Sequence, residues 1–128
     1  MPVSVLILTY NEAANLPRCL ASVAWSDDVL VVDSFSTDDT VAVAEAAGAR
    51  VIQRAFDDFA GQRNHGLDAG DFRHEWVLHI DADEVIPDDL RDEILAVAAG
   101  DGPFDAYRVA SKMMFQGRWL RRAGMYPA

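Results

Sequence analysis

The sequence is short of the features that mark several large classes of protein. Cys19 is its only cysteine, so no disulfide framework can form within the chain, and a reducing compartment is favoured. No apolar run approaches the roughly 20 residues that a membrane-spanning helix needs. The chain enters an apolar segment at residue 3 without a basic leader. We therefore expect a cytoplasmic protein whose membrane contact is at most peripheral, at the inner face.

Familiar phosphate-binding and hydrolytic motifs are also missing. Neither Gly-x-Gly-x-x-Gly nor a Walker sequence follows the first apolar segment, which argues against dinucleotide oxidoreductases and P-loop NTPases. There is no Gly-x-Ser-x-Gly elbow, no His-Glu-x-x-His helix and no cysteine-rich zinc pattern. The three histidines are scattered, and the position of His79 within an apolar run indicates a packed residue rather than a ligand.

Basic residues are few. The 11 Lys and Arg stand against 21 Asp and Glu, which gives a formal net charge of −10. A nucleic acid needs a basic footprint on its partner, so this charge argues against nucleic acid but not against a small phosphorylated ligand bound through a metal. Five basic residues lie between residues 107 and 128 without any acid, where they could meet an anionic acceptor, a membrane surface or an acidic partner segment. They are Arg108, Lys112, Arg118, Arg121 and Arg122.

At 128 residues the chain fits one domain with one core. Short β-branched apolar segments alternate with segments of helical spacing, and Asn11 or Asn15 is placed to cap the first helix. This alternation predicts βαβ units in a Rossmann-like α/β fold, with a mainly parallel sheet, helices on both faces and three α/β/α layers. The predicted strands span residues 3–8, 28–33, 50–53, 76–80 and 106–115, and the predicted helices span 13–25, 40–47, 59–69 and 87–99.

Three acids, Asp81, Asp83 and Glu84, end the apolar segment at residues 76–80. Ionised carboxylates this close repel one another, so a compensating charge is expected. Mg²⁺ and Mn²⁺ prefer carboxylate oxygen and often bridge a protein to the phosphates of its substrate. The alternative is that these acids begin a solvated loop and cap the helix that opens at Pro87.

Two further polar clusters follow predicted strands, at residues 9–12 and at Asp33. The carboxyl ends of parallel strands meet at one edge, where open α/β sheets bind ligands, so these clusters converge with the acids at 81–84. Asp33 suits acceptance of a hydrogen bond from a base or a ribose hydroxyl. The acids suit a metal on a diphosphate, because a divalent cation stabilises the charge of a diphosphate leaving group.

Four segments carry a resemblance to a known family. They are Leu-Thr-Tyr-Asn-Glu at 8–12, Val-Val-Asp-Ser-Phe-Ser-Thr-Asp-Asp-Thr at 31–40, Gln-Arg-Asn at 62–64 and Asp-Ala-Asp-Glu at 81–84. In this order they resemble the motifs of family 2 glycosyltransferases with the GT-A fold, and the segment at 115–127 is similar to lipopolysaccharide-core glucosyltransferase-like proteins. The resemblance implies an inverting, metal-dependent transferase. It would move a sugar from a UDP-linked donor to a glycan or glycolipid acceptor in cell-envelope polysaccharide biosynthesis.

The resemblance also implies roles for single residues, although Thr9 could instead simply end a strand and Arg63 could be an exposed helical charge. Phe35 stands where such proteins often have glycine, at a position that touches no ligand. The implied nucleotide-binding residues are Thr9, Tyr10 and Glu12 in the pocket, Asp33 and Arg63 at the base, and Asp81 with Ala82 near the ribose, while Asp83 and Asp81 would bind Mg²⁺ or Mn²⁺ on the donor's diphosphate.

The general base of such enzymes lies in the half that follows these motifs, and we find no matching segment before Ala128. We therefore predict that residues 1–128 form a single GT-A-type nucleotide-sugar-binding domain, truncated before the acceptor half. Such a domain would bind nucleotide and metal but transfer sugar poorly. An unpaired sheet edge where the other half should lie favours a homodimer.

Three alternatives compete with this interpretation. A receiver-like signalling domain has a similar length and Mg²⁺ site, but it needs paired acids where this chain has Thr9 and a phosphorylated Asp where it has Arg54. A haloacid-dehalogenase-type phosphatase matches Asp-x-Asp-x-Val at residues 81–85, but too little chain follows to supply its other catalytic groups. A nucleotide-binding module without transferase activity keeps the fold and drops the catalysis.

Overall fold

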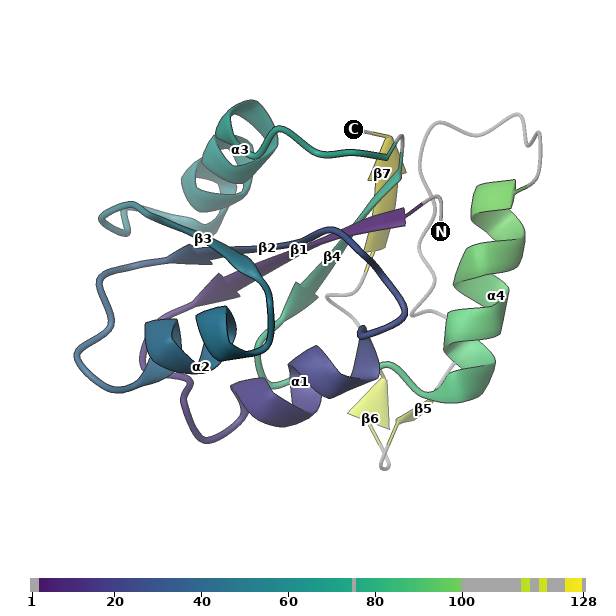
Figure 1. The fold of residues 1–128 in the computed structure, drawn as a ribbon. Coiled ribbons are helices and arrows are strands. Elements are labelled where there is room, and N and C mark those ends of the chain that lie inside the picture. The colour runs from purple at the N-terminus through teal and green to yellow at the C-terminus, as the bar shows by residue number, and fades with distance from the viewer. Residues whose placement is uncertain (1–2, 75, 100–113, 116–117, 120–123, 128) are drawn as a thin grey trace.

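The structure is a computed structural model that describes residues 3–74, 76–99, 114–115, 118–119 and 124–127. Strands and helices alternate from residue 3 to residue 99, as the sequence predicts (Figure 1). The elements are β1 Val3–Thr9, α1 Leu16–Ser22, β2 Val29–Asp33, α2 Thr40–Ala46, β3 Arg50–Gln53, α3 Phe59–Ala69, β4 Trp76–Asp81, α4 Asp88–Ala99, β5 Met114–Phe115, β6 Arg118–Trp119 and β7 Gly124–Pro127.

The main sheet has the strand order β3-β2-β1-β4-β7. Its first four strands are parallel, and β7 is antiparallel to β4, so the predicted mainly parallel sheet is confirmed. The register places Thr9 beside Asp33 and Leu8 beside Asp81. The ends of β1, β2 and β4 therefore lie at one level, and the polar residues that follow them share one edge of the sheet.

Helices cover both faces of the sheet, which confirms the three predicted layers. In Figure 1, α1 and α2 lie below the sheet and α3 lies above it. Alternate side chains of β1 enter two cores, because successive residues of a strand point to opposite faces. Leu6 packs with Leu67 and Phe72 on the α3 side. Val5 and Ile7 belong to the larger core on the other side, together with Leu16, Leu20, Leu90 and Ile94 from α1 and α4.

Helix α3 approaches the sheet closely at Gly66. A Cβ atom at this position would lie 2.8 Å from Leu6 Cδ1 and 3.0 Å from Val32 Cγ2, both closer than ordinary contact. The absence of a side chain therefore allows α3 to sit tightly over β1 and β2. This packing fixes Gln62, one helical turn earlier, at the edge of the sheet.

The first helix is shorter than predicted and is not capped as predicted. It begins at Leu16, and the side chain of Asn15 makes no capping hydrogen bond. Its amide Nδ2 instead donates to Glu12 Oε2 at 3.1 Å. Asn11 adopts a left-handed φ of 52° and accepts the Thr37 N–H at 2.8 Å. Both asparagines thus serve the turn between β1 and α1, which the loop after β2 holds in place.

The C-terminal segment differs most from expectation. The strand predicted at 106–115 falls almost wholly outside the described residues, and only Met114–Phe115 is seen as β5, paired with β6. Strand β7 was not predicted, and it covers the outer edge of β4. The homodimer stays a prediction, with β3 and β7 as the outer strands of the described main sheet. The side chains of the basic C-terminal residues lie outside the described part.

The described helices are all too short or too polar to cross a lipid bilayer.

Candidate functional site

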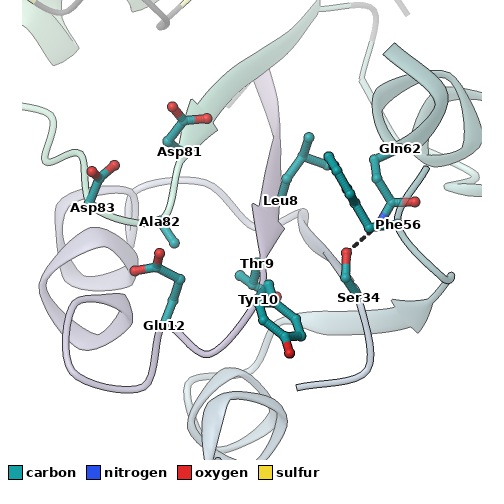
Figure 2. Close-up of a pocket in the computed structure, with 10 residues that line it drawn as sticks. All are labelled: Leu8, Thr9, Tyr10, Glu12, Ser34, Phe56, Gln62, Asp81, Ala82 and Asp83. Atoms are coloured by element: carbon teal, nitrogen blue, oxygen red, sulfur yellow. Dashed lines mark hydrogen bonds between the residues drawn. The ribbon is translucent and has the colours of Figure 1, made fainter. Parts of the chain in front are cut away.

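A pocket of about 450 Å³ opens at the carboxyl edge of the sheet, where the loops after β1, β2, β3 and β4 meet (Figure 2). This volume lies within the range of small-molecule binding sites. Six of the predicted site residues line the pocket, and Asp33 and Arg63 do not. The lining residues are Leu8, Thr9, Tyr10, Glu12, Ser34, Phe56, Gln62, Asp81, Ala82 and Asp83.

The two sides of the pocket differ in chemistry. Figure 2 shows the carboxylates of Glu12, Asp81 and Asp83 gathered on one side, while Phe56 and Gln62 stand on the other. The acidic side can attract a cation, and the opposite side offers an aromatic ring. A ligand with a metal-binding anionic end and a planar end matches this division.

The loop after β1 is tied to the loop after β2 by hydrogen bonds to its backbone. The Asn11 N–H donates to Ser36 Oγ at 2.8 Å, and the Glu12 N–H donates to Thr40 Oγ1 at 2.9 Å. Phe35 has a φ of 58°, which glycine adopts readily but which costs a side-chain-bearing residue about 1–2 kcal/mol. These contacts present Tyr10 and Glu12 to the pocket from a braced turn.

Asp33 is the last residue of β2, and its side chain is fully buried. Its carboxylate accepts hydrogen bonds from Thr9 Oγ1 at 2.7 Å, the Ser36 N–H at 2.8 Å and Gln53 Nε2 at 3.2 Å. Burial raises the pKa of Asp33, but these hydrogen bonds outweigh it and hold the pKa below its usual value. Asp33 is thus an ionised brace for Thr9, and contact of Asp33 with a nucleobase stays a prediction.

Glu84 closes the turn that carries the other acids. Its carboxylate accepts the Asp81 N–H at 2.8 Å, and its own N–H donates to the Asp81 carbonyl at 3.0 Å. Glu84 is buried, at 9% exposure, whereas Asp83 is exposed to solvent. The first turn of α4 holds Asp88 and Asp89 instead. Of the three acids, Asp81 and Asp83 therefore face the pocket, and Glu84 shapes the turn.

The carboxylates in the pocket are too few to hold a metal ion by themselves. They fit a metal ion that is also bound by the phosphates of a substrate. Within the described residues, no three side chains of His, Cys, Asp or Glu form a group that could hold a metal ion. Mg²⁺ usually keeps only one or two protein carboxylates and completes its shell with substrate phosphates and water. Asp81 and Asp83 could supply two such ligands at the mouth of the pocket.

Arg63 lies away from the main pocket. It lines a narrow crevice beside β4 together with His79 and Asp81. His79 is buried, and its burial together with the charge of Arg63 lowers its pKa to about 4. The imidazole is therefore neutral at neutral pH. Arg63 and Asp81 thus line the same crevice, and contact of Arg63 with the base stays a prediction.

Four lining residues were not among the predicted site residues, namely Leu8, Ser34, Phe56 and Gln62. Gln62 is buried, and its Nε2 donates to Ser34 Oγ at 2.7 Å and to the Arg54 carbonyl at 3.2 Å. Its place in the Gln-Arg-Asn segment was a usable signal, since a glutamine on the inward side of a helix needs polar partners. The sequence carries no comparable signal for Phe56.

Cys19 lies under the turn of Asp81, with its Sγ 3.6 Å from the Asp81 carbonyl oxygen. Burial, followed by the charges of Glu84, Asp83 and other nearby acids, raises its pKa to about 12. Because only the thiolate reacts, we expect no labelling by a disulfide reagent at pH 8 while the chain is folded. Labelling in 8 M urea serves as the control. Rapid labelling in native buffer would contradict this burial.

Comparison with known sequences identifies relatives. A family model described as "Glycosyl transferase family 2" matches residues 4–126. An uncharacterized glycosyltransferase of Rickettsia felis is 45% identical over 93 residues, which are 72% of this chain and 32% of the relative. The lipopolysaccharide core biosynthesis glycosyltransferase LpsC of Rhizobium meliloti is 31% identical over 117 residues, or 88% of this chain and 43% of the relative. The chain thus spans less than half the length of these curated relatives.

Solved structures give the same picture of the fold. S. aureus TarS 1-349 in complex with UDP-GlcNAc has a TM-score of 0.65 and 29% identity, over 75% of this chain and 30% of that chain. M. tuberculosis glucosyl-3-phosphoglycerate synthase in complex with UDP has a TM-score of 0.61 and 27% identity, over 78% and 41%. A mannosyltransferase from Pyrobaculum calidifontis reaches a TM-score of 0.71 at 23% identity, over 98% and 44%. These likenesses confirm the predicted Rossmann-like GT-A arrangement.

Proposed function

The chain belongs to glycosyl transferase family 2, and on that premise we propose that its pocket binds the nucleotide diphosphate of a sugar donor. The observation that carries the proposal is the division of the pocket into an acidic side and an aromatic side (Figure 2). A nucleoside diphosphate has the same division, with a charged diphosphate at one end and a planar base at the other. Thr9, Tyr10, Glu12 and Ala82 would contact the nucleotide between these ends.

We propose UDP as the nucleotide. The TarS and glucosyl-3-phosphoglycerate synthase structures, which resemble this chain above 25% identity, were obtained with UDP-GlcNAc and UDP. Asp33 would affect nucleotide binding through Thr9, whose side chain it holds by a hydrogen bond. A direct contact of the base with Asp33 or Arg63 would require the ligand to extend beyond the residues that line the pocket. The sugar is left open, because sugar contacts in such sites come from other segments.

Asp81 and Asp83 would hold Mg²⁺ or Mn²⁺ against the donor's diphosphate. When bound there, the ion supplies electrostatic stabilisation of the charge that develops on the leaving diphosphate, without any proton transfer. The chain's own contribution is the position of the two carboxylates, which the hydrogen bonds between Glu84 and Asp81 fix at the end of β4. The electrostatic cost of placing two carboxylates side by side falls when a cation joins them.

The reaction proposed for the whole protein is inverting transfer of a hexose to a glycan or glycolipid acceptor. The likeness to LpsC, a lipopolysaccharide core glycosyltransferase, supports an acceptor in the cell envelope. We propose that residues 1–128 are the donor-binding domain and that a segment outside them supplies the general base. A binding module without transferase activity is the second candidate, because the chain covers 43% or less of the two relatives described above. The cytoplasmic location and peripheral membrane contact remain predictions.

Calorimetric titration of the chain with UDP, GDP and ADP, each with and without Mn²⁺, tests the donor site. We expect UDP to bind in the presence of Mn²⁺, to bind much more weakly without it, and to bind better than GDP or ADP. Equal heats with and without metal would count against the metal proposal alone. Absence of binding by every nucleotide at millimolar concentration with Mn²⁺ would contradict the donor-site proposal.

A further inference from the structure

Phe56 is an exposed aromatic residue at a pocket wall. The described part of the chain exposes three large hydrophobic side chains by more than half, namely Tyr10 at 57%, Phe35 at 55% and Phe56 at 51%. Each follows a different strand, β1, β2 or β3, at the same edge of the sheet. Tyr10 and Phe56 line the pocket, whereas Phe35 does not. About half of the Phe56 side chain is exposed, and it lies at the pocket, where a bound ligand can contact it.

The loop that carries Phe56 is held by a network of polar contacts. The Arg54 guanidinium donates to Asp57 Oδ1 at 2.9 Å and to Gln62 Oε1 at 2.9 Å, and the Arg54 N–H donates to the Asp33 carbonyl at 3.0 Å. Gln62 in turn donates to Ser34 Oγ, as the dashed line in Figure 2 shows. Arg54 therefore joins the loop to α3 and to the end of β2, and its ion pair with Asp57 lies within the loop.

Gly61 allows this network to close. A Cβ atom at position 61 would lie 2.5 Å from Asp57 Oδ1, 2.9 Å from Asp58 Oδ1 and 3.0 Å from Arg54 Nη1. Real Cβ atoms essentially never approach within 3.0 Å of another atom, so a side chain at this position would require Asp57 and Asp58 to shift. Arg54 and Asp57 flank Phe56 in the chain, so Gly61 leaves room for the ion pair that spans the Phe56 loop.

We propose that Phe56 forms the aromatic wall of the nucleobase subsite, and that Gly61 and Arg54 position it. The inference rests on the proposed donor site and adds the orientation of the ligand in it. The base lies toward the β3 side, where Phe56 lines the pocket away from the acids (Figure 2), and the diphosphate lies toward Asp81 and Asp83. Stacking of a base on an aromatic side chain strengthens binding by roughly tenfold or more, as alanine substitution measures it.

The test is calorimetric titration of UDP with saturating Mn²⁺ into four variants. Phe56→Ala should weaken UDP binding by about tenfold, Phe56→Leu should restore little of it, and Phe56→Tyr should bind like the wild type, because the ring rather than apolar volume is required. Phe35→Ala is the matched control. It removes an equally exposed ring outside the pocket and should leave the affinity unchanged.

Titration with inorganic pyrophosphate and Mn²⁺ distinguishes the contribution of the base to binding from that of the diphosphate. Phe56→Ala should bind pyrophosphate as the wild type does, since pyrophosphate has no base to stack. If the wild type binds UDP and Phe56→Ala binds it equally well, the inference is wrong and the donor site stands. If the wild type binds no nucleotide, the inference about Phe56 and the donor-site proposal are both wrong. An equal loss of UDP and pyrophosphate binding would also overturn the inference, because it would indicate a general disturbance of the pocket.

A double-mutant cycle tests the positioning role of Gly61. Gly61→Ala should weaken UDP binding in the wild-type background and have little further effect in the Phe56→Ala background, because its effect passes through the ring. Additive losses would contradict that role. Circular dichroism and the urea midpoint of each variant verify that the fold is retained.

Discussion

Replacing Asp83 with asparagine is expected to remove the metal-dependent part of UDP binding. At saturating Mn²⁺ the affinity should fall by at least about 100-fold, since losing a group that only hydrogen-bonds to a metal ligand already costs 10- to 100-fold in metal affinity. Asp83 lines the pocket, faces solvent and lies two residues beyond β4, where a ligand phosphate can approach it. Asparagine keeps the shape of the side chain and removes its charge, so a loss reports on the charge.

The control for this variant is Asp92→Asn. Asp92 lies on α4 in a surface ion pair with Arg91, 68% exposed, and its replacement changes the net charge by the same amount without touching the pocket. Without metal, wild type and Asp83→Asn should bind UDP equally weakly, which isolates the ion's contribution. Undiminished Mn²⁺ dependence in Asp83→Asn would show that other groups hold the ion. Isothermal calorimetry with Mn²⁺ titrated into the UDP-saturated chain measures this directly.

The strands and the place of the site could be predicted from the sequence because both depend on local pattern. Apolar runs such as residues 3–8 and 76–80 specify buried parallel strands, and parallel strands bring their carboxyl ends to one edge. Thr9 and Asp81, which end β1 and β4, therefore line the pocket with Asp83, and their contact with a nucleotide or metal stays a prediction. The topology of the sheet thus determines where these residues lie, and their side chains determine what they can bind.

The parts that could not be predicted depend on contacts between segments far apart in the chain. Asn11 accepts a hydrogen bond from Thr37, 26 residues away, and this contact decides that Asn11 serves a turn rather than a helix cap. Phe56 lines the pocket from a loop that hydrogen bonds between Arg54 and Gln62 fasten to α3. Strand β7 belongs to the sheet through its pairing with β4, about 50 residues earlier, which no local pattern indicates.

The opposite edge of the sheet holds a second buried carboxylate, which serves stability. Asp28 is 3% exposed and precedes β2. It accepts hydrogen bonds from Ser4 Oγ at 2.7 Å, the Arg73 N–H at 2.8 Å and Arg50 Nη2 at 2.8 Å. These partners come from β1, β3 and the segment before β4, so one side chain ties together the beginnings of several parallel strands.

Replacing Asp28 with alanine is expected to lower the free energy of unfolding by about 3 kcal/mol, because it leaves the buried Ser4 hydroxyl, the Arg73 backbone N–H and the partly exposed Arg50 guanidinium without their acceptor. Asp27→Ala is the matched control at the neighbouring residue. Asp27 is 59% exposed and pairs with His74 at the surface, so its loss should cost much less stability than the loss of Asp28. Urea unfolding followed by circular dichroism measures both. Equal losses for the two variants would contradict the bracing role of Asp28.

The pH dependence of stability offers an independent check on the same carboxylate. Burial raises the pKa of Asp28, but the hydrogen bonds from Arg73, Ser4 and Arg50 outweigh it and the pKa lies below its usual value. Its stabilising contribution is therefore complete above the unfolded-state pKa of about 3.9 and is lost as the pH falls through the lower folded-state pKa. Asp28→Asn cannot make this contribution at any pH. The gap in urea midpoint between wild type and Asp28→Asn should thus be widest at pH 7, persist at pH 5 and narrow below pH 4, whereas a constant gap would mean that the charge of Asp28 does not stabilise the fold.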